Sequence, residues 1–180
     1  QNGVFAFTQN ELAYSIQAST YPCIHGEKAV LSVLRSDALM TLASLGMNEG
    51  QVQSVNRLAR RPGGLLLVAG PWSSGKTATL YSLAVQCSHD ESHVITIEDP
   101  VEHRLPGINQ AQVNVSAGLT YETGMRAILR QDPDIILVGE ILDHPTGKLV
   151  MDACLQAGRR VLSSVHTDTA LEAIDWLLNL

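Results

Sequence analysis

The chain has 180 residues, of which 45% are hydrophobic and 4% aromatic, and 18 acidic residues against 12 lysines and arginines give a net charge of −6. This length allows one well-formed core and part of a second domain, and the scarcity of aromatic residues favours α/β layers over an all-β sandwich. The acidic balance excludes a chain-wide attraction to nucleic acid or to an anionic membrane leaflet.

Residues 1–36 read as three short strands. The stretches VFAFT, LAYSIQAS and KAVLSVL have strand-like patterns, and Asn10 and His25-Gly26 fall in the turns between them. Because three strands alone make a poor core, we expect these residues to be the C-terminal part of a smaller α/β domain that precedes the main one.

Residues 37–64 change to helical spacing and are predicted to form a helical linker. Apolar side chains recur on one helical face, stop at Gly46, and then resume. The sequence Arg61-Pro62-Gly63-Gly64 predicts a break before the next domain. The apolar positions are Leu39, Leu42, Leu45, Val52, Val55, Leu58 and Ala59.

From residue 65 to residue 180, strand and helix patterns alternate. Repeated βα units predict a mostly parallel sheet covered on both faces, with right-handed crossovers. Ligands collect at the carboxyl ends of such strands, where Gly70, Glu98, Glu140 and His166 all fall. The predicted strands are 65–70, 94–98, 135–140 and 161–166, and the predicted helices are 76–87, 120–131, 145–157 and 169–179.

The sequence GPWSSGKT at 70–77 fits the phosphate-loop pattern G-x-x-x-x-G-K-[ST]. Its glycines let backbone N–H groups turn inward as an anion nest, and a helix beginning at Lys76 adds the positive end of its dipole. We expect Lys76 to reach the β- and γ-phosphates of a nucleotide and the Thr77 hydroxyl to bind Mg²⁺. The other residues expected to contact the phosphates are Gly70, Ser73, Ser74, Gly75 and Ala78.

Two carboxylate motifs follow predicted strands. Glu98 ends VITIE and Asp99 follows it, and a carboxylate beside a γ-phosphate can orient and deprotonate the attacking water. Alternatively, Asp99-Pro100 makes only a turn with solvated acids. Gly139-Glu140 follows IILV, which is typical of a second nucleotide motif whose acid reaches Mg²⁺. Glycine stands here where many such ATPases carry aspartate, so Glu140 is the only acid of this motif.

Two ring side chains accompany these motifs. His166 ends VLSSVH, and its imidazole can contact a γ-phosphate or serve as an ordinary core histidine. Trp72 lies at a variable position of the phosphate loop, where it either stacks on another group or is an exposed loop tip. Both alternatives stay open for each residue.

The cysteine spacing and the lengths of the apolar runs indicate the compartment in which the protein works. Cys23, Cys87 and Cys154 lie far apart without a C-x-x-C pair, which indicates a reducing compartment and no zinc site. No apolar run approaches the roughly 20 residues of a membrane span, and no signal peptide is visible. Since the chain opens at Gln1 and closes in a predicted amphipathic helix, we expect a fragment cut at both ends.

Four pieces together resemble a known family. GPWSSGKTATLYS, ITIEDPVEHRLPGINQAQVN, GLTYETGMRAILRQDPDIILVGE and VLSSVHTD resemble the phosphate loop, Asp box, second nucleotide motif and His box of the secretion ATPase superfamily. The nearest branch is that of the type II secretion and type IV pilus assembly ATPases. STYPCIHGEKAVL and LGM also resemble the end of that family's second N-terminal domain.

The resemblance implies a RecA-like domain that binds ATP and Mg²⁺ next to the N-terminal domain. It implies a cytoplasmic homo-hexamer held at the inner face of the bacterial inner membrane by a platform protein of a pilus or secretion machine. We expect no nucleic-acid partner, because the acidic charge balance gives such binding no electrostatic support. It makes Glu98 the water-activating base, Asp99 and Glu102 the rest of the Asp box, and Glu140 and His166 the acid and the histidine of the later motifs. LPGINQ after the Asp box favours assembly or secretion over retraction.

The chain departs from the family mainly by losing arginines. Gln17, Ser32 and Leu142 stand where the family usually has arginine, and Trp176 replaces a further one near the last helix. Arginine fingers contribute about 10³–10⁵ in rate where they have been studied. Two hypotheses therefore stay open: a hydrolysing motor subunit, or a nucleotide-binding structural subunit with little turnover.

Overall fold

A computed structural model describes residues 2–10, 12–35, 41–88, 92–156 and 158–179. The chain divides into two compact units. One contains Gln1–Leu39 with Glu102–Arg104, and the other contains Met40–Val101 with Leu105–Leu180. The domain limits that we expected from the sequence stay a prediction.

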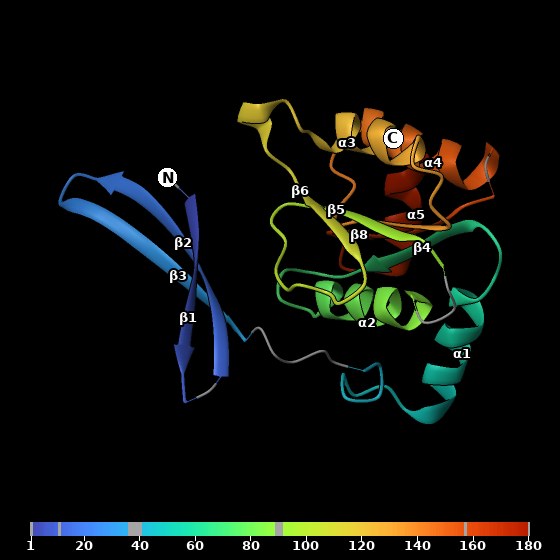
Figure 1. The fold of residues 1–180 in the computed structure, drawn as a ribbon, viewed down its shortest axis with the longest axis horizontal. Helices are drawn as coiled ribbons and strands as arrows, with labels where there is room; N and C mark the ends of the chain where they lie inside the picture. Colours follow the sequence, from blue (N-terminus) through green and yellow to red (C-terminus); the bar gives the residue numbers. More distant parts are fainter. Residues whose placement is uncertain (1, 11, 36–40, 89–91, 157, 180) are drawn as a thin grey trace. The chain divides into compact units, whose positions relative to one another are not determined.

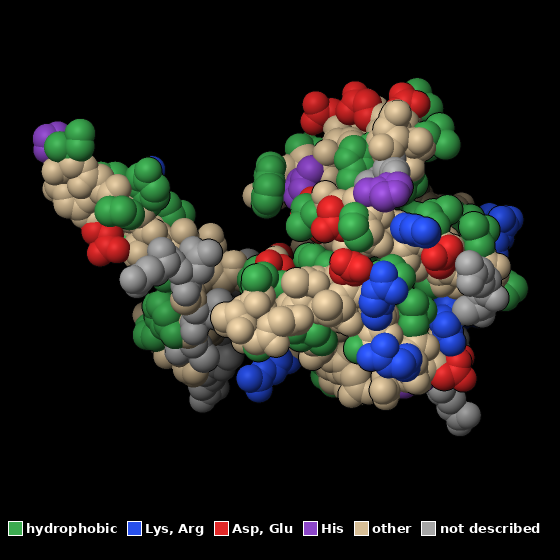
Figure 2. Space-filling view, turned by 90° about the horizontal axis from the view of Figure 1, so that it is seen from above, with side chains coloured by type: hydrophobic (Ala, Val, Ile, Leu, Met, Phe, Trp, Pro, Cys, Tyr) green, Lys and Arg blue, Asp and Glu red, His purple; other side chains and the backbone are tan. Residues whose placement is uncertain are grey.

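The smaller unit is an antiparallel sheet of three strands in the order β1-β2-β3. The expected strands are present but longer, with β1 at Asn2–Gln9, β2 at Leu12–Cys23 and β3 at Gly26–Arg35. Apolar side chains lie along its surface (Figure 2), and these include Phe5, Phe7, Tyr21, Val30, Leu31 and Val33.

The expected helical linker is only partly helical. Residues 36–40, with Leu39, lie outside the described residues. Residues 42–46 form hydrogen-bonded turns, because the Thr41 and Ser44 side chains bond each other's backbone and compete with a helix. Helix α1 follows at Glu49–Ala59 and is capped reciprocally by Asn48 and Gln51, with both hydrogen bonds at 2.9 Å.

The larger unit contains a five-stranded parallel sheet in the order β4-β8-β7-β5-β6, as the alternating pattern predicted (Figure 1). Strand β6 was not expected from the sequence. The strands are β4 at Gly64–Ala69, β5 at Val94–Glu98, β6 at Asn109–Gln112, β7 at Ile135–Val138 and β8 at Arg160–Val165. The helices are α2 at Lys76–Ser88, α3 at Tyr121–Leu129, α4 at His144–Gln156 and α5 at Ala170–Leu178.

Alternation along each strand gives the sheet two apolar faces. Ile135 and Leu137 of β7 pack into a cluster with α1 and α2, whereas Ile136 and Val138 pack into a second cluster with α3 and α4. Figure 1 shows α2 on one side of the sheet and α3 and α4 on the other. None of the helices in the described ranges has the length and apolarity needed to cross a bilayer.

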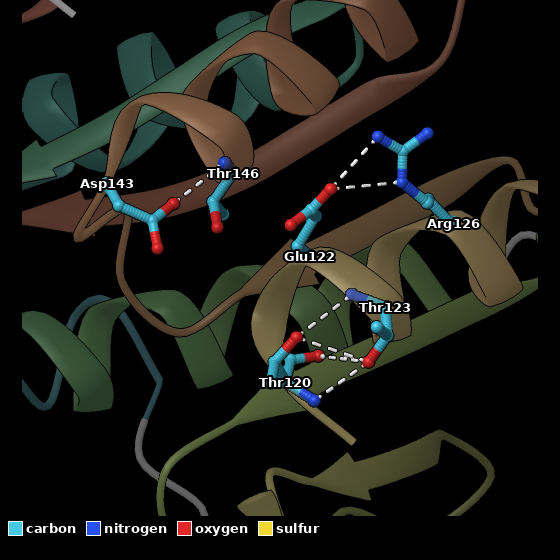
Figure 3. Close-up of polar contacts among 6 residues, drawn as sticks. All are labelled: Thr120, Glu122, Thr123, Arg126, Asp143 and Thr146. Atoms are coloured by element: carbon cyan, nitrogen blue, oxygen red, sulfur yellow. Dashed lines mark hydrogen bonds and ion pairs between the residues drawn. The ribbon is translucent and has the colours of Figure 1, made fainter. Parts of the chain in front are cut away.

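Polar caps fix where α3 and α4 begin (Figure 3). Thr120 and Thr123 exchange hydrogen bonds at 2.8 and 3.1 Å, which satisfies N–H groups in the first turn of α3. Asp143 accepts a hydrogen bond of 2.8 Å from the backbone N–H of Thr146 at the start of α4. These caps determine the residues at which α3 and α4 begin.

Candidate nucleotide site

The phosphate loop joins β4 to α2, and α2 begins at Lys76 as expected. A β-carbon at Gly70 would lie 2.5 Å from the Ser74 Oγ, so a side chain at this position would require Ser74 to move. Gly75 has φ +90° and Ser73 has φ 60°, so the backbone turns tightly just before the helix. The loop therefore has the backbone curvature that a phosphate cradle requires.

Lys76 is folded back on the loop and is only 9% exposed. Its Nζ donates to the carbonyl oxygens of Gly70 at 2.9 Å and Pro71 at 2.8 Å, and it lies 3.1 Å from the Nδ1 of His166. An ammonium has three donors, and all three have acceptors here. Burial lowers the pKa of Lys76, and the negative charge of Glu140 partly opposes this shift.

His166 joins Lys76 to Glu140. Because the Lys76 ammonium can only donate, the Nδ1 of His166 accepts and its remaining ring hydrogen lies on Nε2. That Nε2 is 3.1 Å from the Oε1 of Glu140 and donates to it. The three side chains thus form a connected chain of hydrogen bonds from the phosphate loop to the second carboxylate.

The backbone around Glu140 explains why it meets His166. The N–H of Gly139 donates to the Ile97 carbonyl at 2.8 Å, and the Ser164 hydroxyl donates to the Gly139 carbonyl at 2.7 Å. These bonds hold the end of β7 between β5 and β8. Burial raises the pKa of the Glu140 carboxyl, although His166 and Lys76 oppose the shift, so desolvation outweighs the attraction within this cluster.

Trp72 of the phosphate loop stacks on the imidazole ring of His166. Its ring centroid is 4.0 Å from that of His166 with an interplanar angle of 24°, yet the side chain is 81% exposed. Both alternatives that we left open for Trp72 therefore apply: it is an exposed loop residue and it stacks on a second group.

Glu98 has a different environment from Glu140. It is only 3% exposed, and its carboxylate accepts hydrogen bonds from side chains of three elements. These donors are the Tyr81 hydroxyl of α2, the Thr96 hydroxyl at 2.5 Å and the Gln110 amide at 3.1 Å. The carboxylate thus connects the phosphate-loop helix to β5 and β6 in the interior.

Tyr121, the first residue of α3, lies among the carboxylates. A β-carbon at Gly139 would be 3.2 Å from its hydroxyl and 3.4 Å from the Cα of Glu98. The aspartate that many such ATPases carry at this position would therefore crowd Tyr121. Burial first, and then the charges of Asp99, Glu140 and Glu98, raise the pKa of Tyr121 above its usual range, so its hydroxyl stays protonated.

The remaining predicted site residues are not members of this hydrogen-bonded cluster. Thr77 and Ala78 are half-buried in the first turn of α2, and Ser73 and Ser74 are exposed on the loop. Asp99 is exposed after β5, whereas Glu102 belongs to the smaller unit. In the part of the chain that the structure describes, no three His, Cys, Asp or Glu residues gather as a metal-binding group.

Two of the positions that lack arginine are neighbours in the smaller unit. Gln17 and Ser32 are direct partners across β2 and β3, so the two substitutions affect one patch of the small sheet. Leu142 follows Glu140 by two residues and is 61% exposed. Among the described residues, the Nε2 of Gln17 is buried without a hydrogen-bond partner.

Sequence reasoning missed four side chains of this site: Tyr81, Thr96, Gln110 and Tyr121. Tyr81 and Gln110 lie 17 and 12 residues from Glu98 in the sequence. Both fall within pieces that resemble family motifs, but at positions to which the motifs gave no role. The position of Gln110 follows from the strand order, which places β6 next to β5.

A parallel α/β sheet with a phosphate-loop sequence at its carboxyl edge defines the class of phosphate-loop proteins with a RecA-like core. The family model for type II/IV secretion system proteins matches residues 1–180. The chain belongs to this family.

Individual relatives agree with this assignment. The type II secretion system protein E of Pectobacterium carotovorum subsp. carotovorum is 42% identical over 178 residues, which are 98% of this chain and 36% of that protein. The type IV pilus assembly ATPase PilB of Thermus thermophilus is 39% identical over 175 residues, which are 97% of this chain and 20% of that protein. The chain thus spans about a third or less of the length of these relatives.

A solved structure has the same fold. The crystal structure of the pilus retraction motor PilT with bound ADP matches with a TM-score of 0.76 and 29% identity. The match covers 99% of this chain and 51% of the PilT chain. The smaller sheet and the larger parallel sheet therefore both have counterparts in a secretion-type ATPase.

Proposed function

We propose that the protein binds Mg-ATP at residues 70–78 and hydrolyses it as the motor subunit of a type IV pilus assembly or type II secretion machine. The observation that supports this best is the hydrogen-bonded chain of Lys76, His166 and Glu140, with distances of 3.1 Å at both steps. It joins a phosphate loop to a carboxylate at the carboxyl edge of a parallel sheet. Similarity to PilB and to type II secretion protein E supports the same class of machine.

The residues present fit a bound magnesium nucleotide. The close approach of Gly70 to Ser74 and the positive φ of Gly75 give the loop the tight curvature that a phosphate-binding nest needs. Lys76 would hold the β- and γ-phosphates, and Thr77 and Glu140 would hold Mg²⁺. The magnesium ion, when bound, neutralises charge on these phosphates. His166 would contact the γ-phosphate and transmit its loss to β8.

Glu140 is better placed than Glu98 to contact the attacking water. It is connected to the phosphate loop through His166, whereas Glu98 is enclosed by the donors Tyr81, Thr96 and Gln110. A carboxylate whose oxygens already accept several hydrogen bonds has few lone pairs left for a water molecule. We therefore propose that Glu140, reaching Mg²⁺ through a water molecule, orients the attacking water, and that Glu98 positions α2 against β5.

The assembly and location are also proposals. By its family, the protein would act as a homo-hexamer on an inner-membrane platform protein, at the cytoplasmic face of the bacterial inner membrane. It would reach the membrane through its partners and would not bind nucleic acid. On the face shown in Figure 2, basic and acidic side chains of the larger unit are interspersed, which gives no extended basic track.

The alternative is a nucleotide-binding structural subunit with little turnover. It is favoured by the cross-strand pair Gln17 and Ser32, where the family usually has two arginines. In the family these arginines act on the γ-phosphate, so by that resemblance their loss, together with that of the arginine at Leu142, would leave the charge developing there with fewer compensating cations.

Steady-state Mg-ATP hydrolysis separates the two functions. The variants to compare are Glu140→Gln and the double variant Gln17→Arg/Ser32→Arg. A control with the same residue types is Gln53→Arg/Ser54→Arg, on an exposed part of α1. Turnover of the wild-type protein that is lost in Glu140→Gln supports the motor. If the wild-type protein has no turnover and the Gln17→Arg/Ser32→Arg variant gains it while the control variant does not, the structural subunit is supported. ATP binding without turnover in every variant contradicts the motor.

A further inference from the structure

Trp72 is the one large side chain in the variable part of the phosphate loop, since Ser73, Ser74 and Gly75 follow it. An indole that is 81% exposed has little packing to hold it in place. Its one ring contact in the described structure is the stack on His166, at 4.0 Å and 24°. Offset aromatic stacking of this kind is favourable beyond simple burial.

The stack acts on the imidazole that receives a hydrogen bond from Lys76. Two of the three Lys76 donors go to carbonyls of the loop itself, and the third goes to the Nδ1 of His166. The first two bonds are internal to the loop and can persist with a ligand present. A phosphate oxygen can therefore replace His166 at the third donor without breaking the two bonds within the loop, so His166 occupies a position that a phosphate oxygen can take.

We propose that Trp72 is a positioning residue that holds His166 against Lys76, so that the imidazole competes with nucleotide phosphate for the third donor of the lysine. This inference rests on the proposed Mg-ATP site and assigns the loop residue that sets its affinity. Trp72 covers one face of the ring, while the Oε1 of Glu140 fixes its Nε2 at 3.1 Å. Binding of a phosphate then requires His166 to leave Lys76 and the stack to loosen.

The size of the effect follows from the stacking contribution. Because Mg-ATP binding would have to break the stack, a variant without the Trp72 ring should bind Mg-ATP roughly 2- to 12-fold more tightly than the wild type. Trp72→Thr removes the ring, and Trp72→Phe keeps an aromatic face and is the matched control. Because Trp72 is exposed, neither substitution removes a core contact.

Calorimetric titration with Mg-ATP gives the affinities of four proteins: wild type, Trp72→Thr, Trp72→Phe and Lys76→Ala. We expect Trp72→Thr to bind more tightly than the wild type and Trp72→Phe to match the wild type. Equal affinities of the Thr and Phe variants, with clear binding that Lys76→Ala weakens, would overturn the inference and leave the proposed function intact. Binding by none of the proteins would overturn both.

Two further readouts separate positioning from a general change in the loop. In a double-mutant cycle, Trp72→Thr should have no further effect on affinity in a His166→Ala background, because the stack no longer exists. The tryptophan fluorescence of the wild type, corrected with Trp72→Phe for Trp176, should change on saturation with Mg-ATP. The proposal would be overturned if Trp72→Thr changed the affinity equally in the wild-type and His166→Ala backgrounds. It would also be overturned if the Trp72 fluorescence were the same with and without bound Mg-ATP.

Discussion

Replacing Lys76 with alanine removes the only ammonium that lies inside the phosphate loop of the described structure. The structure limits the size of the effect, because two of its three hydrogen bonds go to the Gly70 and Pro71 carbonyls and one is available for exchange. A hydrogen bond to a charged group contributes about 1.5–3 kcal/mol. One exchanged bond therefore corresponds to an affinity for Mg-ATP that is about 10- to 150-fold weaker in Lys76→Ala.

The assay is a calorimetric titration of the protein with Mg-ATP at fixed salt. Lys148→Ala is the matched control, since Lys148 is exposed on α4 and its replacement makes the same change in net charge. We expect the control to bind like the wild type. Equal affinity of Lys76→Ala and wild type, or equal weakening in both variants, would refute the assignment of residues 70–77 as the phosphate site.

Three predictions concern stability. Tyr81→Phe removes a hydrogen-bond donor to the buried Glu98 carboxylate and should lower the free energy of unfolding by about 1–3 kcal/mol. Urea unfolding measures this difference, and an unchanged free energy of unfolding would mean that this hydrogen bond does not stabilise the protein. Burial raises the pKa of Glu140 in the folded state, so its ionisation costs stability as pH rises above the ordinary value of 4.5. Melting temperatures of Glu140→Gln should therefore gain on the wild type as pH rises, and a constant difference would contradict this. Gly124→Ala should lower the free energy of unfolding by about 1–3 kcal/mol, because its β-carbon would lie 2.0 Å from the buried Ile97 side chain. Gly50→Ala should raise it by about 0.5–1 kcal/mol, because a β-carbon there has room and alanine favours a helix over glycine. Thermal melts in which both variants shift the melting temperature in the same direction would contradict this pair of predictions.

The sequence was sufficient for most of the larger unit. Strands β4 and β7 are apolar runs, and β5 and β8 are buried strands whose apolar residues are interrupted by a few polar ones. The helices between them have clear apolar spacing, so the existence of these elements was predictable. Strand β6 has the polar sequence NQAQ and was missed, because an edge strand paired only to β5 needs no apolar run. The helix expected around Leu42 was wrong, since local side-chain hydrogen bonds of Thr41 and Ser44 favour turns.

The site was predictable in position but not in its connections. Placing Gly70, Glu98, Glu140 and His166 at strand ends required only the βα pattern. The contact of His166 with both Lys76 and Glu140 depends on β8 lying between β4 and β7, which no local signal encodes. The roles of these residues in binding and hydrolysis stay predictions.

The pairing of β4 with β8 has a consequence for synthesis of the protein. Leu65 lies opposite Val161, and β4 is an edge strand of the described sheet. The strand that leads into the phosphate loop therefore has no sheet partner while the ribosome adds the residues between them. At 5–20 residues per second this wait is about 5–20 s. During that time the apolar strand LLLVA lacks its only neighbour in the described sheet, so the His166 contact of the phosphate loop can form only after β8 has been made.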